Sequence, residues 1–164
     1  MIKIRLFDEN DWGATWRIIE PVLRAGETYA FSPDITEKEA HQVWVETPLA
    51  TFVAEGKNDS ILGTYFIKPN QPGLGSHVCN CGYIVAQEAR GKGIAAKMCE
   101  HSQHEAVSLG FRAMQFNLVV STNESAIRLW KRLGFDIIGV LPESFRHYRL
   151  GFVDANIMYK LLKS

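Results

Sequence analysis

The chain has 164 residues, of which 46% are hydrophobic and 22% charged, as in an ordinary globular protein with a substantial core. Eighteen basic residues balance eighteen acidic ones, so the charge suggests neither nucleic acid nor an anionic membrane as a partner. The longest apolar runs have the length of strands, and the N-terminus lacks the apolar core of a signal peptide. We expect one domain over residues 1–164 and, by default, a cytoplasmic location.

The first expected element is a strand over residues 2–7, and a helix follows it. Asp8 or Asp11 can cap this helix, and Pro21 should kink or end it. Its apolar residues recur at helical spacing, and they are Trp12, Trp16, Ile19 and Leu23. The chain therefore opens with a strand and an amphipathic helix.

A loop over residues 25–35 carries the aromatic side chains Tyr29 and Phe31. The capping-box pattern Thr36-x-x-Glu39 then opens a second, short helix. Six further strands are expected, at residues 50–55, 60–68, 78–86, 112–120, 135–141 and 153–162.

Two more helices separate these later strands. One begins after residue 86 and runs to about Leu109, with Gly110 just beyond its end, and Asn123 caps the other, which Gly134 ends. The element order is β-α-α-β-β-β-α-β-α-β-β. It predicts an α/β (α+β) fold with a mixed, twisted central sheet of about six to seven strands flanked by about four helices.

The three cysteines are Cys79, Cys81 and Cys99, and an odd number argues against a disulfide framework. Cys79 and Cys81, with His77 nearby, could form half of a metal site. However, they lie in an expected strand among apolar neighbours, and no second ligand pair follows at zinc spacing. We expect buried, reduced thiols and no metal.

Residues 88–98 read EARGKGIAAKM and contain two candidate phosphate loops. The glycines fit the dinucleotide pattern G-x-G-x-x-A, and the segment from Arg90 fits R-x-x-G-x-A. Backbone N–H groups at a helix N-terminus attract phosphate, and glycine permits positive φ or close approach of a ligand. Arg90 and Lys92 add positive charge. The loop alone does not separate the two patterns.

The surroundings of the loop disfavour the dinucleotide. That fingerprint needs an acidic residue at the end of the next strand, where this chain has VVST (119–122). A Walker loop is excluded as well, because Gly93 follows Lys92 where Ser or Thr is required.

Two motifs resemble the GNAT acetyltransferase superfamily. Residues 90–95 (RGKGIA) fit its R/Q-x-x-G-x-G/A loop, with GYIVAQEA as the usual preceding strand. Residues 123–135 (NESAIRLWKRLGF) are similar to its second signature, N-x-x-A-x-x-L-Y-x-x-x-G-F. The resemblance covers about residues 48–162, and the expected element order matches the superfamily's fold.

The resemblance implies acetyl-CoA as the acetyl donor. The CoA pyrophosphate would lie on the amides of Arg90, Gly91, Lys92, Gly93, Ile94 and Ala95. The pantetheine arm would run along Ile84 and Val85 like an added strand, between strands 78–86 and 112–120 that splay apart. An amide of Val85 or Ile84 would polarise the thioester carbonyl, and the acceptor amine would attack it directly.

Trp130 stands where many relatives have a tyrosine that protonates the departing thiolate. An indole N–H does not give up a proton at neutral pH, so we expect Trp130 to form a wall for the CoA arm. Tyr148 and Tyr83 are candidate replacements. Alternatively, the thiolate leaves unprotonated, since a thiol pKa is about 8.5.

Asn80 and Asn117 interrupt apolar strands, where an amide needs hydrogen-bonding partners. On strand 112–120 the even positions after Arg112 are apolar, and Gln115 and Asn117 share the other face, which we expect to line the cleft. Local structural pairing of the two asparagines is the alternative.

A narrower resemblance, to the azetidine-2-carboxylate (proline-analogue) acetyltransferases, rests on segments such as SHVCNCGY (76–83) and VDANIMYK (153–160). It implies that Asn80 holds the acceptor carboxylate and that Asn117 and Asn123 orient the acetyl-CoA end of the site. The residues expected to contact the acceptor are Asn80, Asn117 and Tyr83, and those expected to take part in catalysis are Asn117, Asn123 and Tyr148.

The expected function is an N-acetyltransferase acting on a small-molecule amine, with an amino or imino acid as a candidate acceptor. The alternatives are acetylation of a protein or peptide N-terminus and a non-catalytic acyl-CoA-binding module. A homodimer is compatible with the resemblance. No spacing singles out a general base among Glu27, His77, Glu143, His147 and Tyr148.

Overall fold

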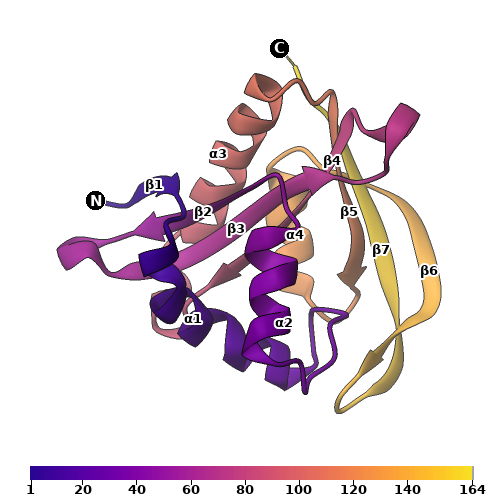
Figure 1. Cartoon of the computed structure of the whole chain (residues 1–164). Coiled ribbons are helices and arrows are strands. Elements are labelled where there is room, and N and C mark those ends of the chain that lie inside the picture. Colours follow the sequence, from indigo (N-terminus) through magenta and orange to yellow (C-terminus); the bar gives the residue numbers. More distant parts are fainter. Residues whose placement is uncertain (164) are drawn as a thin grey trace.

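The computed structural model describes residues 1–163, which form one seven-stranded sheet with helices on both faces (Figure 1). The strands lie in the order β1-β2-β3-β4-β5-β7-β6. Their bounds are β1 Lys3–Leu6, β2 Ala50–Glu55, β3 Ile61–Pro69, β4 Val78–Val85, β5 Ala113–Val120, β6 Asp136–His147 and β7 Gly151–Leu161. The helices are α1 Trp12–Ala25, α2 Glu37–His41, α3 Ile94–Ser108 and α4 Glu124–Arg132. The predicted fold class and element order are confirmed.

The two faces of the sheet carry different helices. Side chains alternate along β4, so that the Tyr83 hydroxyl reaches Ser102 of α3, whereas Gly82 faces the loop that follows α1. α1 and α2 cover one face, and α3 and α4 cover the other (Figure 1). We call these two sides of the sheet the α1 face and the α3 face.

Pro21 does not end the first helix, which was one of the two outcomes expected for it. Pro21 lies inside α1, and the helix continues beyond it to Ala25. Leu23, beyond the proline, is 1% exposed, so its burial against the sheet offsets the hydrogen bond that proline cannot make. Gly26 ends the helix in the left-handed region, with φ 64°.

The predicted capping box at Thr36 is confirmed. The Glu39 amide donates to the Thr36 hydroxyl, and the Thr36 amide donates to the Glu39 carboxylate, at 3.2 and 2.8 Å. A wider turn over Gln42–Glu46 follows α2 and buries Trp44 completely. The Trp44 indole donates to the Thr64 hydroxyl of β3 at 3.1 Å, which fixes this region on the α1 face.

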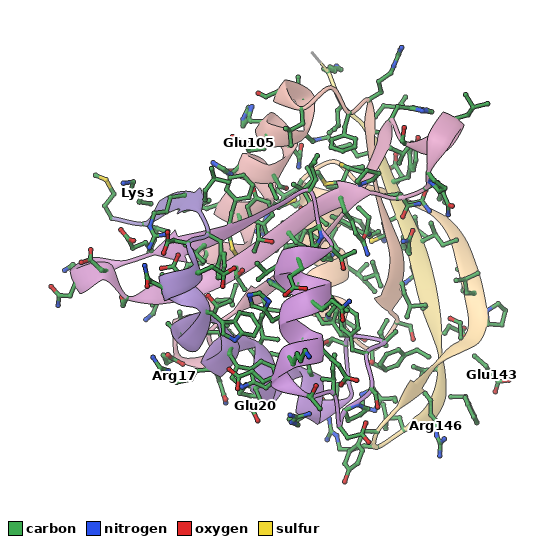
Figure 2. The ribbon with its side chains drawn as sticks, viewed as in Figure 1. Lys3, Arg17, Glu20, Glu105, Glu143 and Arg146 are labelled. Atoms are coloured by element: carbon green, nitrogen blue, oxygen red, sulfur yellow. The ribbon has the colours of Figure 1, made fainter. Side chains whose placement is uncertain are left out.

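β6 is longer than predicted and extends to His147. Its pairing with β7 shifts between Leu141 and Phe145, and Glu143 has φ 49°, so the strand contains a bulge. Pro142 and the bulge interrupt the strand pattern, so the sequence does not predict the second half of β6. Figure 2 shows Glu143 and Arg146 extending outward from this part of the sheet, where both are exposed.

The predicted splaying of β4 and β5 is confirmed. These parallel neighbours pair only at Val78↔Ala113 and Cys79↔Met114, although each continues for six more residues. On its other side β4 stays paired with β3 as far as Val85. A wedge-shaped gap therefore opens between β4 and β5 toward their C-terminal ends.

The apolar alternation predicted for β5 holds only in its first half. A bulge between Phe116 and Val119 shifts the pattern, so that Val119 is buried and Leu118 only half-buried, contrary to the expectation. At the two ends of α3, Ile94 is buried whereas Leu109, just beyond the helix, is 45% exposed.

The three cysteines are buried and unpaired, which confirms the expected burial. Burial raises the pKa of the Cys99 thiol to about 11, and it raises the pKa of Cys81 as well. Within residues 1–163, no group of three or more His, Cys, Asp or Glu residues could hold a metal ion.

His101 of α3 should make the protein less stable in mild acid. Its Nδ1 lies 2.8 Å from the Tyr65 hydroxyl, and burial lowers the pKa of its imidazole. The unfolded chain takes up this proton at a pKa of about 6.5, so stability is present above that pH and is lost as the pH falls below it. One proton changes the free energy of unfolding by at most about 1.4 kcal/mol per pH unit.

Urea unfolding of the wild type and His101→Gln at pH 7.0 and 5.5 tests this prediction. Glutamine keeps an acceptor for Tyr65 but takes up no proton in this range, so the loss of stability between the two pH values should shrink. The depressed pKa of Asp11, caused by Arg5, acts only below about pH 4 and does not interfere. An equal loss in both proteins would contradict the prediction.

Candidate active site

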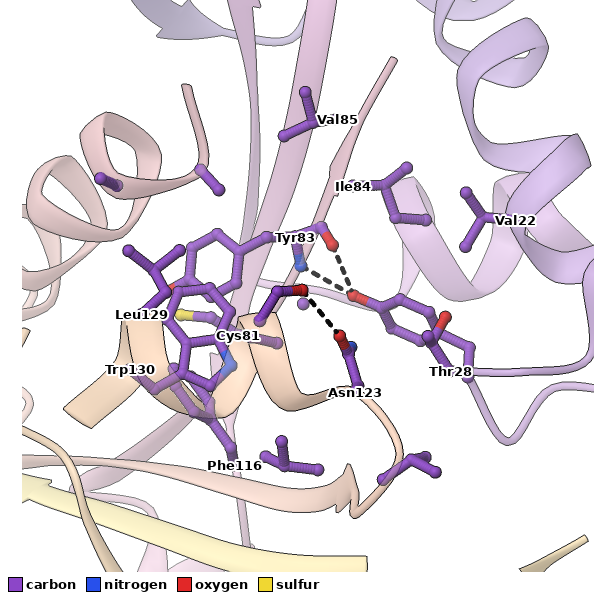
Figure 3. Close-up of a pocket in the computed structure, with 18 of the residues that line it drawn as sticks. Val22, Thr28, Cys81, Tyr83, Ile84, Val85, Phe116, Asn123, Leu129 and Trp130 are labelled. Carbon is purple, nitrogen blue, oxygen red and sulfur yellow. Dashed lines mark hydrogen bonds between the residues drawn. The ribbon is translucent and has the colours of Figure 1, made fainter. Parts of the chain in front are cut away.

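A cleft of about 870 Å³ opens where β4 and β5 part. Its lining comes from both sides of the sheet: Val22 of α1, the loop over residues 26–35, the C-terminal half of β3, the edge of β4, the start of α3, the end of β5 and α4 (Figure 3). The gap in the sheet is thus a passage between the α1 face and the α3 face.

The glycine loop forms one end of the cleft. Gly91 and Gly93 have φ of 75° and 76°, and Gly93 is the N-cap of α3, which begins at Ile94. A Cβ built at either glycine would meet nothing within 4 Å, so the loop needs glycine for its positive φ and not for lack of space. Amides of the first turn of α3 have no helical partner and suit an anion.

Of the six residues predicted to bind the CoA pyrophosphate, all but one line the cleft. Arg90, Gly91, Gly93, Ile94 and Ala95 all line the cleft. Lys92 is exposed and does not belong to this lining.

The free edge of β4 presents alternate backbone groups to the cleft. The Tyr29 hydroxyl accepts from the Tyr83 amide at 2.8 Å and donates to the Tyr83 carbonyl at 2.9 Å. The Ala86 amide instead donates to the Leu62 carbonyl, at the end of β3 that lies nearer the glycine loop. Because alternate residues of a strand point their backbone groups the same way, the cleft-facing residues are Cys81, Tyr83 and Val85.

This alternation excludes the Ile84 amide, one of the two amides expected to stabilise the oxyanion. The amide of Ile84 points toward β3, where Ile84 pairs with Thr64. The amide of Val85 remains as the candidate of the two, although the Ile84 side chain still lines the cleft.

Tyr29 fastens the loop after α1 to the free edge of β4. Its ring stacks on Phe31 at 6.0 Å, and burial raises the pKa of its hydroxyl, which therefore stays protonated. Gly82 makes room for it, because a Cβ there would lie 2.6 Å from the Phe66 ring and 3.1 Å from the Tyr29 hydroxyl. Sequence reasoning missed this contact, for which a glycine inside a strand was the available signal.

Tyr83 and Trp130 lie on the α3 side of the cleft. The Tyr83 hydroxyl lies 2.6 Å from the Ser102 hydroxyl, and burial raises its pKa. Trp130 is 9% exposed, with its ring centroid 5.1 Å from the rings of both Tyr83 and Phe116 (Figure 3). Trp130 thus stands in the cleft wall, and the Tyr83 hydroxyl points into α3 instead of toward an acceptor.

The three predicted asparagines take different positions. Asn80 donates to the Gln115 carbonyl at 2.9 Å, just beyond the last β4–β5 pair. The side-chain amide of Asn117 accepts a hydrogen bond from the side-chain amide of Gln115 at 3.0 Å and donates one to Asn70 Oδ1 at 2.7 Å. These contacts are the local pairing considered as the alternative, although both side chains belong to residues that line the cleft.

Asn123 occupies the expected N-cap position of α4, but its side chain makes no capping hydrogen bond. Its Oδ1 instead lies 3.5 Å from the Ser125 hydroxyl at the cleft (Figure 3). Tyr148 is 77% exposed in the turn between β6 and β7 and does not line the cleft. The structure therefore does not bring Tyr148 together with the other predicted catalytic residues.

The cleft is electropositive. Four cationic residues line it, namely Lys68, Arg90, Arg128 and Arg132. Within residues 1–163, no Asp or Glu belongs to the lining. Sequence reasoning missed Lys68, Arg128 and Arg132; for the two arginines the available signal was their i, i+4 spacing on α4. The site suits a long ligand with an anionic end at the glycine loop and an amide-bearing arm along β4, which is the class of acyl carriers.

The comparisons with known proteins agree with this class. The model of the acetyltransferase (GNAT) family matches residues 14–135. The N-acetyltransferase aca1 of Schizosaccharomyces pombe is 35% identical over 151 residues, which cover 82% of this chain and 72% of the relative. The chain belongs to the GNAT family, and it is an acetyltransferase.

Solved structures show the same fold. A GCN5-related N-acetyltransferase from Kribbella flavida superposes with a TM-score of 0.93 at 38% identity, covering 98% of both chains. A phosphinothricin acetyltransferase of the GNAT superfamily from Sinorhizobium meliloti, solved with acetyl-CoA, gives a TM-score of 0.85 at 19% identity over 98% of this chain and 88% of that chain. None of the helices within residues 1–163 has the length and hydropathy to cross a membrane.

Proposed function

We propose that this N-acetyltransferase transfers the acetyl group of acetyl-CoA directly to the amine of a small molecule, with amino and imino acids as the candidate acceptors. The free edge of β4, directly preceding the glycine loop, is the observation that carries the proposal. The Tyr29 hydroxyl already holds the backbone groups of Tyr83, and the edge leaves those of Cys81 and Val85 for an extended ligand, beside a helix N-terminus that suits its phosphates.

In this proposal the pyrophosphate lies on the amides of residues 90–95. Arg90 supplies charge there, and Arg128 and Arg132 of α4 add positive charge to the lining of the cleft. The pantetheine arm follows the free edge of β4 against Trp130. When the amine attacks, a cleft-facing amide of β4 stabilises the negative charge that develops on the thioester oxygen.

The acceptor would enter from the α1 face, where Tyr29, Phe31 and Asn80 line the cleft. Asn117 and Asn123 keep their proposed role in orienting the acetyl end of acetyl-CoA. We assign no proton donor for the thiolate, because the Tyr83 hydroxyl is held by Ser102 and Tyr148 lies outside the cleft. A thiolate with an ordinary pKa of about 8.5 can leave without one.

The Sinorhizobium meliloti protein of the same fold is a phosphinothricin acetyltransferase, which is consistent with this proposal. Acetylation of a peptide N-terminus is the second candidate, because a ribosomal-protein-alanine N-acetyltransferase from Brucella melitensis has the same fold, with a TM-score of 0.87 at 22% identity.

Release of the CoA thiol from acetyl-CoA distinguishes these functions. The purified protein is incubated with amino acids, imino acids, other small amines and short peptides with free N-termini, and the acetylated product is identified by mass spectrometry. We expect turnover with a small amine. Turnover confined to peptides would favour the second candidate, and tight CoA binding without turnover of any amine would indicate a non-catalytic acyl-CoA-binding module.

Three further predictions accompany the proposal. They are a single domain over residues 1–164, a cytoplasmic location and a homodimer.

A further inference from the structure

Lys68 lies on the acceptor side of the cleft, beside Asn80. The two residues face each other in the β3–β4 register, so their side chains project from the same face of the sheet. Two residues further along each strand, Phe66 pairs with Gly82, and these two residues therefore lie on the same face as Lys68 and Asn80. This is the α1 face, because the Phe66 ring contacts Trp44 and Gly82 lies beside the Tyr29 hydroxyl. Lys68 and Asn80 both line the cleft.

The Lys68 ammonium has no anionic partner among the described residues. No carboxylate of residues 1–163 forms a salt bridge with it, and the cleft lining offers none. Its Nζ lies over the Phe66 ring, 5.4 Å from the ring centroid. Lys68 is half-buried, and a partly desolvated cation gains from an anionic partner.

In the proposed mode of binding, the CoA pyrophosphate would lie too far away to be this partner. Asn80, opposite Lys68, precedes Val85 by five residues, which is about 16 Å along a strand, and the glycine loop lies beyond Val85. Three other cations line the cleft, and one of them, Arg90, belongs to the glycine loop itself, whereas Arg128 and Arg132 come from α4. Lys68 therefore stands at the end that remains for the other substrate.

Aromatic side chains surround this position. Phe66 lies beneath Lys68, the Tyr29 hydroxyl lies beside Gly82, two residues along β4 from Asn80, and Phe31 stacks on Tyr29. Asn80 adds an amide whose nitrogen already donates one hydrogen bond to Gln115. The site thus combines one full positive charge, one polar amide and an apolar wall.

We propose that Lys68 binds the carboxylate of the acceptor, so that the enzyme selects amines that carry an acidic group close to the amino group. The substrate class is then an α-amino or imino acid in its anionic form, with its side chain against the aromatic wall. The inference rests on the proposed function, and it assigns to Lys68 the charge recognition that the sequence resemblance assigned to Asn80.

Matched acceptor pairs test the inference. Alanine, leucine, proline and azetidine-2-carboxylate are each compared with their own carboxamide in wild type, Lys68→Met and Lys68→Arg. Methionine keeps the length and apolar stem of lysine without its charge, and Lys57→Met, in the exposed turn after β2, is the matched control.

The wild type should prefer the acids, and Lys68→Met should raise KM for an acid by about 10- to 100-fold, the effect of losing one hydrogen bond to a charged group. The KM values for the carboxamides and for acetyl-CoA should not change. Lys68→Arg should retain part of the preference, and Lys57→Met should behave as the wild type.

The outcomes separate the inference from the function on which it rests. If the wild type acetylates acids and carboxamides equally, or if Lys68→Met weakens both alike, the inference is overturned and the proposed function stands. If neither acids, carboxamides nor other amines are acetylated, the proposed function fails and the inference fails with it.

Discussion

Gly93→Asp is expected to weaken the binding of acetyl-CoA at least about 100-fold. Gly93 has φ 76°, where a residue with a Cβ is strained by about 1–2 kcal/mol. The aspartate would also place a negative charge at the N-terminus of α3, against the pyrophosphate that we propose to lie there. Isothermal titration of the variant with CoA measures the loss directly.

Gly151→Asp is the matched control for this experiment. Gly151 has φ 78°, and a Cβ there would also meet nothing within 4 Å, but it begins β7 and does not line the cleft. The two variants therefore introduce the same charge at a similar backbone strain, and only Gly93→Asp should lose CoA affinity. Equal affinities in both variants would show that the pyrophosphate does not lie on this loop.

Val85→Pro is expected to lower kcat/KM for acetyl-CoA by between about tenfold and 1000-fold. Proline removes an amide that faces the cleft, while the β3–β4 hydrogen bonds use the alternate residues and stay intact. The lower bound corresponds to one lost hydrogen bond to the pantetheine arm. The upper bound corresponds to a lost oxyanion donor.

Steady-state kinetics with the best acceptor distinguish these two roles of the Val85 amide. A rise in KM for acetyl-CoA at constant kcat would indicate a contact with the arm, and a fall in kcat would indicate the oxyanion. Val85→Ala keeps the amide and is expected to retain activity. Unchanged kinetics in Val85→Pro would remove this amide from the site, provided that urea unfolding shows a folded protein.

The elements with regular periodicity and clear end signals could be predicted from the sequence. The strands β2 to β5, the capping box at Thr36 and the glycine loop before α3 follow from local patterns, and the structure confirms them. The irregular parts could not be predicted in the same way. The bulges in β5 and β6 depend on how each strand pairs with β7, and no local pattern records that pairing.

The same distinction applies to the site. The residues of the glycine loop were predictable because they are consecutive, whereas Tyr29 bonds to a strand residue 54 positions away. The choice between the amides of Ile84 and Val85 depends on which of them faces β3, and this is a property of the sheet. In the sequence Lys68 is an ordinary lysine near the end of a strand, and only the pairing of β3 with β4 shows that it lies opposite Asn80.

The parting of β4 and β5 has a consequence for how such an enzyme can diverge. The groups proposed to hold the donor lie within residues 81–132, whereas those proposed to meet the acceptor come mainly from the loop over residues 26–35 and from β3. A lineage could therefore acquire a new acceptor through substitutions in the first seventy residues and leave the acetyl-CoA half unchanged. The N-terminal loop is then the segment where descendants with different substrates should differ most in sequence.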